Sequence, residues 1–147
     1  PDCDLLDLGP ESAAPAARPE IADAIRQGRA TLRDFALIEV AGHAVGWSDW
    51  FAEQEGEAPI PAMVADSDAL ALAMIEHMDA VMLGRRFALA EAFAAGRLRL
   101  ADDRSLDGPD RYALTKPRGR AQRPAAAAFV WFLVRRWSLP APAPEWG

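Results

Sequence analysis

DSDALALAMIEHMDAVMLGRRFALAEAFAAGRL, residues 66–98, predicts a helix, a short strand, a charged turn and a second helix, in that order. Asp66 or Ser67 suits the N-cap of the first helix, because its side-chain oxygen accepts a hydrogen bond from an amide of the first turn. Gly96 suits the end of the second helix. The predicted segments are the helix Asp68–His77, the strand Ala80–Leu83, the turn Gly84-Arg85-Arg86 and the helix Phe87–Ala95. This order is typical of an α/β binding domain.

The segments on either side extend the same alternation. Pro19 favours the first turn of a helix, since its missing N–H has no partner there. Trp47, Trp50 and Phe51 share one face of a short helix, which predicts a core-facing aromatic stripe. Further predicted elements are a helix over 20–27, strands over 35–40 and 62–65, a helix over 47–54, a half-exposed strand near Leu98–Leu100, a strand over 111–115 and a helix over 124–137. We therefore expect an α/β fold, a mixed sheet flanked by helices.

The two ends of the chain look less ordered. The apolar pattern of Leu5, Leu6 and Leu8 is lost at Gly9-Pro10, so residues 1–19 are expected to be a poorly ordered segment. Residues 138–147 form a Pro/Ala-rich tail that should be disordered or extended. The domain is therefore expected over residues 20–137.

Charge is divided unevenly along the sequence. Residues 1–75 carry 14 Asp and Glu against 4 Lys and Arg, whereas residues 76–147 carry 8 against 12, giving the net charge of −6. The acidic balance disfavours wrapping of DNA, and the basic run from Arg111 to Arg123 is interpreted as a solvated loop. The single cysteine, Cys3, permits no disulfide within the chain, and no apolar run is long enough to span a membrane. We expect a cytoplasmic protein.

Two positions are candidates for binding an anion. Asp66, Ser67 and Asp68 precede a helix, where free backbone amides and the helix dipole favour negative charge. The alternative is ordinary N-capping, with the two Asp side chains competing against an anionic ligand. Gly84, Arg85 and Arg86 follow a strand, the usual ligand position in open α/β sheets, and either arginine can pair with a carboxylate. The alternative is that both arginines are solvated.

No arrangement of residues typical of an enzyme is present. His43 and His77 have no second ligand at metal-binding spacing, so no metal is expected. The sequence lacks a nucleophile elbow, a phosphate-binding loop and a dinucleotide motif, which disfavours an enzyme and predicts no cofactor.

Four segments, taken in order, resemble the effector-binding domain of LysR-type transcriptional regulators: GWSDWFAEQ, DSDALALAM, AVMLGRRFALAEAFAAGRL and YALTKPRGRAQRPAAAAFVWFL. Within that family they are most similar to the glycine-cleavage-activator branch. The resemblance implies one lobe of a type II periplasmic-binding-protein-like fold, mainly the second lobe, with the last helix returning to the first. It also implies an effector in the cleft between lobes, here a small carboxylate-bearing molecule, and DNA binding only through a helix-turn-helix that these residues do not contain. The family usually has an apolar strand at residues 9–12 and a Gly-rich turn at residues 76–79, and this chain departs from both.

The last predicted helix is apolar all round over Phe129–Val134, which a helix tolerates only when it is buried on several sides. In the family that this chain resembles, the first lobe covers this helix. If that lobe is missing, the exposed apolar area has the size of an interface. We therefore expect a homo-oligomer or a partner chain at Phe129, Trp131, Phe132 and Trp137. The alternative to sensing is a protein-interaction module derived from the same scaffold.

Overall fold

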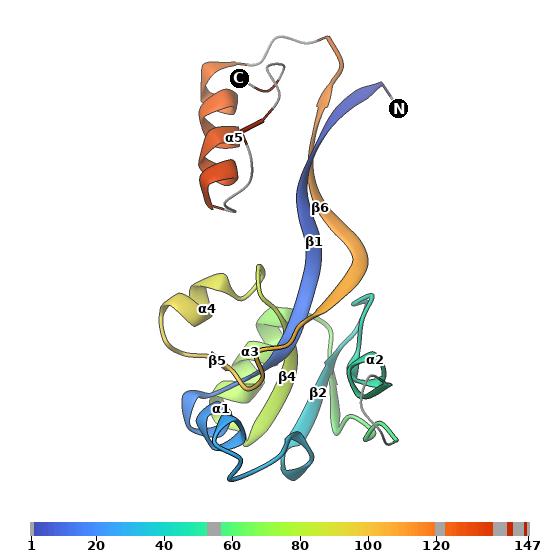
Figure 1. Cartoon of the computed structure of the whole chain (residues 1–147), viewed down its shortest axis with the longest axis vertical. Helices are drawn as coiled ribbons and strands as arrows, with labels where there is room; N and C mark the ends of the chain where they lie inside the picture. Colours follow the sequence, from blue (N-terminus) through green and yellow to red (C-terminus); the bar gives the residue numbers. More distant parts are fainter. Residues whose placement is uncertain (1, 53–56, 120–122, 137–140, 143–145, 147) are drawn as a thin grey trace. The chain divides into compact units, whose positions relative to one another are not determined.

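The computed structural model describes residues 2–52, 57–119, 123–136, 141, 142 and 146 (Figure 1). The chain divides into two compact units: unit 1 comprises Pro1–Pro10 and Arg111–Gly147, and unit 2 comprises Glu11–Asp110. The long strands β1 (Cys3–Ala17) and β6 (Leu106–Pro117) pair with each other, and the chain passes between the units in these two strands (Figure 1). Within the described residues, no helix is long and apolar enough to cross a membrane.

Unit 2 is built on a mixed sheet. Its strand order is β3-β2-β4-β1-β5, where β2 is Ala36–Val40, β3 is Met63–Ala65, β4 is Ala80–Arg85 and β5 is Arg99–Leu100. β3, β2 and β4 are parallel to one another, while β1 runs antiparallel to both β4 and β5. The carboxyl ends of the three parallel strands therefore lie at one edge of the sheet, where open α/β sheets bind ligands.

Both faces of this sheet are apolar, because side chains alternate along each strand and helices cover both sides. Leu37, Val81 and Leu83 pack with α1 (Pro19–Arg26) and α2 (Trp47–Ala52). Their neighbours Ile38 and Met82 pack on the other face with α3 (Asp68–His77) and α4 (Ala90–Ala94). The result is a three-layer α/β/α arrangement, and the predicted α/β fold with a mixed sheet is confirmed.

The helix α2 is fixed by its aromatic side chains and by one carboxylate. Trp47, Trp50 and Phe51 are buried, as predicted. The Trp47 indole donates a hydrogen bond to the carbonyl of Ile38 at 2.9 Å, and a Glu39 carboxylate oxygen accepts one from the Trp47 amide at 3.2 Å. A Cβ at position 46 would lie 2.6 Å from Glu39 Oε1, so a glycine leaves room for this carboxylate at the start of the helix.

Unit 1 has a small core of its own. Val130 and Val134 of α5 (Pro124–Arg136) pack with Trp146, and Leu6 and Leu114 lie against them. Trp146 is buried, although residues 138–147 were expected to be a disordered or extended tail. Its large ring covers apolar area on α5, and Lys116 lies over the ring at 5.2 Å. Most of that tail lies outside the described residues.

The structure corrects three further details. Residues 3–17 form β1, although the segment 1–19 was expected to be poorly ordered; Gly9 carries the strand past the break with φ +113°, which glycine adopts freely. Gly84 and Arg85 belong to β4 and not to a turn, because the strand continues to pair with β1 as far as Ala13↔Arg85. The helix predicted over 87–95 is shorter, Ala90–Ala94.

Candidate functional site

A pocket of about 530 Å³ opens at the carboxyl edge of the parallel strands in unit 2. It lies where the loops after β2 and β3 meet the end of β4, as the sheet topology requires. This volume suits a small molecule. Its lining combines polar side chains with short and branched apolar ones: Val40, Ala41, Gly42, His43, Asp66, Ser67, Asp68, Ala69, Leu72, Arg85, Ala88 and Leu89.

Arg85 and two carboxylates form the centre of the polar cluster. The Arg85 Nε donates to Asp68 Oδ2 at 3.0 Å, its Nη2 donates to the same oxygen, and its Nη1 donates to Glu11 Oε1 at 2.7 Å. Burial disfavours the charged guanidinium, but these two carboxylates outweigh it and hold the pKa of Arg85 above its usual range. Arg85 is therefore a permanent cation whose partners come from β1 and from the first turn of α3.

His43 adds a buried imidazole to the same cluster. Its side chain is only 6% exposed, and its Nε2 lies 3.5 Å from Asp68 Oδ2. Neither His43 Nε2 nor the other carboxylate oxygen, Asp68 Oδ1, has a hydrogen-bond partner among the residues that the structure describes, although both atoms are buried. Leaving such groups unsatisfied is costly. A ligand in the pocket can supply the missing partners.

Ser67 performs the capping role that the sequence offered as one alternative. Its Oγ accepts a hydrogen bond from the Leu70 amide at 3.3 Å and donates one to Asp66 Oδ1 at 3.0 Å. The hydroxyl proton therefore points to a carboxylate of the chain itself. Asp66 is exposed, which places a second negative charge at the pocket rim.

The structure brings together four of the six predicted site residues. Asp66, Ser67, Asp68 and Arg85 all line the pocket. Gly84 and Arg86 do not: Gly84 is buried in β4, where an added Cβ would lie 2.7 Å from Leu89 Cδ1, and Arg86 is exposed. Whether any of these residues contacts an effector stays a prediction.

Sequence reasoning missed His43 and Glu11. His43 was considered only as a metal ligand, yet it follows β2 and so lies beside the loops after the neighbouring parallel strands. Glu11 was assigned to a poorly ordered segment. Glu11 lies near the end of β4 because β1 pairs with β4 in an antiparallel register. No pattern in the sequence predicts that pairing.

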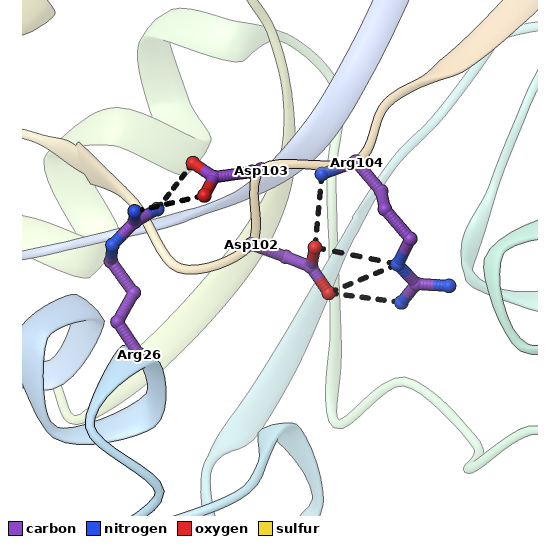
Figure 2. Close-up of polar contacts among 4 residues, drawn as sticks. All are labelled: Arg26, Asp102, Asp103 and Arg104. Carbon is purple, nitrogen blue, oxygen red and sulfur yellow. Dashed lines mark hydrogen bonds and ion pairs between the residues drawn. The ribbon is translucent and has the colours of Figure 1, made fainter.

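A second polar cluster in unit 2 lies around the loop after β5 (Figure 2). Arg26 holds Asp103 with two hydrogen bonds of 2.7 and 3.0 Å, and Arg104 binds Asp102 at 2.9 Å. These pairs lower the pKa of Asp103, and also that of Asp102 although partial burial opposes it. A cavity of about 310 Å³ adjoins them. All four side chains have partners, so this cluster ties the loop to α1.

The fold is an α/β domain with a pocket at the carboxyl edge of its parallel strands. The chain belongs to the family described as the LysR substrate binding domain, whose family model matches residues 1–138. The resemblance seen in the sequence is thereby confirmed at the level of the family, while the glycine-cleavage-activator branch stays a prediction. The regulatory domains of this family bind effectors.

Solved structures agree with this fold. The effector domain of the transcriptional regulator AmpR of Pseudomonas aeruginosa is 20% identical with a TM-score of 0.65, over 93% of this chain and 66% of that one. The AmpR effector-binding domain from Citrobacter freundii is 21% identical with a TM-score of 0.66, over 93% and 68%. Full-length LysG from Corynebacterium glutamicum with bound effector Arg is 14% identical with a TM-score of 0.54, over 92% and 47%.

The chain thus spans about two thirds of the similar effector domains and about half of the full-length regulator. A search of curated protein sequences found no match.

Proposed function

We propose that this chain is the effector-sensing part of a cytoplasmic LysR-type transcriptional regulator and binds a small molecule in the pocket beside His43, Asp68 and Arg85. The observation that carries the proposal is the pair of buried atoms without hydrogen-bond partners, His43 Nε2 and Asp68 Oδ1, on the wall of a pocket of ligand size. The bound arginine of LysG is a ligand of that protein, and it supports an effector of similar size here.

A carboxylate on the effector, as the sequence predicts, finds one arginine and no lysine among the described residues that line the pocket. Arg85 is already paired with Asp68 and Glu11, so a carboxylate effector must replace one of them. Such an exchange couples binding to a rearrangement of β1 or α3. Sensing then works as a population shift, in which the effector favours the arrangement of the regulator that binds it more tightly. No catalytic role is proposed.

A thermal-shift screen with amino acids, small organic acids and aromatic acids tests this function. A true effector raises the unfolding temperature further as its concentration rises, because the stabilisation grows with the logarithm of concentration and reaches about 2.7 kcal/mol at 100 times Kd. Ala88→Trp, an exposed position on the pocket wall, should abolish the response by filling the pocket. Ala94→Trp, exposed on α4 outside the pocket, should keep it. A flat response of the folded protein across the whole panel contradicts the proposal.

A second candidate function is protein interaction through α5. Phe129 is 54% exposed, Trp131 39% and Phe132 60%, and we name these three side chains the α5 aromatic surface. Trp137, the fourth predicted interface residue, lies outside the described residues. Domains of this family oligomerise, and exposed aromatic clusters of this kind mark interfaces. This function needs a docked partner chain and no ligand in the pocket.

A further inference from the structure

We propose that the pocket recognises a protonated amine of the effector, with Asp68 Oδ1 as its acceptor. This inference rests on the proposed function and specifies the ligand class. It starts from His43 Nε2 and Asp68 Oδ1, two buried polar atoms that have no hydrogen-bond partner among the described residues. Asp68 Oδ2 is fully used by Arg85, so the carboxylate is held in place with its second oxygen free for a donor.

The geometry of these two atoms suits an ammonium group. His43 Nε2 lies 3.5 Å from the Asp68 carboxylate, so both unsatisfied atoms belong to one cluster on one pocket wall. An ammonium has three donors and no acceptor, so it can donate to Asp68 Oδ1 and still use its other protons elsewhere in the pocket. A carboxylate has no proton for Asp68 Oδ1. The His43 side chain is 6% exposed and the Asp68 side chain 11%, so both side chains are largely removed from solvent.

The charges around the pocket select the same class of ligand. Asp66 and Asp68 line the pocket and Glu11 contacts Arg85, against one cation, Arg85 itself. The three carboxylates therefore outnumber the one guanidinium by two. The Ser67 proton, the obvious donor at the start of α3, is directed to Asp66. An anionic ligand meets repulsion here, whereas an ammonium is attracted.

The rest of the pocket wall limits what the amine is attached to. Val40, Leu72 and Leu89 provide apolar contact beside the polar cluster. An aliphatic or aromatic amine of amino-acid size therefore fits both parts of the wall. An amino acid carries a carboxylate as well, which can exchange into the ion pair of Arg85, while a simple amine leaves that pair intact.

Matched ligand triplets separate these possibilities. Calorimetric titrations use leucine, leucinamide and N-acetylleucine, with the corresponding series for alanine, phenylalanine and arginine. We expect the amides or the free amino acids of at least one series to bind, and acetylation of the amine to weaken binding at least about 30-fold, as for a buried ion pair that loses one partner. If the amino-acid amides bind, the amine is sufficient for binding. If only the free amino acids bind, the carboxylate is needed as well.

Two variants test the acceptor. Asp68→Asn keeps the shape but removes the charge, and should weaken the amine at least about 30-fold. Glu76→Gln removes one charge from the same helix outside the pocket and should leave the affinity unchanged. Because Asp68→Asn can also destabilise the fold, the acetylation series on the unmodified protein decides the question independently.

The outcomes that overturn the inference are distinct from those that overturn the proposed function. N-acetyl compounds that bind as tightly as their parents, or an unchanged affinity in folded Asp68→Asn, exclude the amine site. Ligands without an amine, found in the broader acid screen while every amine fails, exclude it too and leave the effector function standing. Failure of every ligand in both panels overturns both.

Discussion

At the scale of single residues, charged side chains in unit 2 serve two different purposes. Around the pocket, Asp68 and Arg85 are partly buried together, and Asp68 Oδ1 has no hydrogen-bond partner among the described residues. Around the loop after β5, Arg26 and Asp103 are exposed and fully paired (Figure 2). The first arrangement suits a ligand, and the second stabilises the fold.

The Arg26–Asp103 pair predicts a pH dependence. The hydrogen bonds from Arg26 lower the folded-state pKa of Asp103 below its unfolded value of about 3.9. The stabilisation is therefore fully present above the unfolded pKa and is lost as the pH falls through the folded pKa. Arg26→Gln should lower stability at pH 6, and the difference from the unmodified protein should shrink towards pH 3, in urea unfolding followed by circular dichroism.

The matched control is Arg29→Gln. Arg29 lies just beyond the same helix and its guanidinium binds Gln27, so its removal changes the charge equally without touching a carboxylate pair. Its stability difference should stay nearly constant with pH. An Arg26→Gln curve that runs parallel to that of the unmodified protein contradicts the assigned pair.

At the scale of elements, the predictable parts are those with a local cause. The stripe of Trp47, Trp50 and Phe51 predicted a core-facing helix, and all three residues are buried. Ser67 predicted the start of α3, where it is the N-cap. β1 was missed because its order comes from partners distant in sequence, β4, β5 and β6, which no local pattern reveals. For the same reason the sequence did not predict that Glu11 is one of the two carboxylates paired with Arg85.

The packing of α2 against the sheet predicts a large loss of stability on truncation. Trp50 is 2% exposed, and Arg104 lies over its ring at 4.7 Å. Trp50→Ala should reduce the free energy of unfolding by about 3–5 kcal/mol, because it removes buried apolar area and leaves a cavity. Urea unfolding measures this, with Trp50→Phe as a milder variant if the alanine variant does not fold.

The control for Trp50→Ala is the truncation of an exposed apolar residue on another helix. Leu70 on α3 is 44% exposed, so Leu70→Ala should change stability by less than about 1 kcal/mol. Equal losses for Trp50→Ala and Leu70→Ala would mean that α2 is not part of the core.

At the scale of the whole molecule, the two units differ in what they contain. Unit 2 contains the sheet, its helices and the pocket, whereas unit 1 contains α5 with a buried side and the α5 aromatic surface. In unit 1, Val130, Leu133 and Val134 are buried, while Phe129 and Phe132 stack on each other at 6.5 Å and remain exposed. Aromatic side chains of this size stabilise an interface strongly when a partner covers them.

We therefore predict that a second copy of the chain covers the α5 aromatic surface. Size-exclusion chromatography with light scattering should give a mass above that of the 15.9 kDa chain as the concentration rises. Phe129→Ser combined with Phe132→Ser should return the mass to that of the single chain, because it removes most of the apolar area that a partner would bury. Phe87→Ser, at a residue of unit 2 that is 41% exposed, should leave self-association unchanged. A single-chain mass for the unmodified protein at high concentration would exclude the second copy, and the effector site in unit 2 would be unaffected, since none of its lining residues belongs to unit 1.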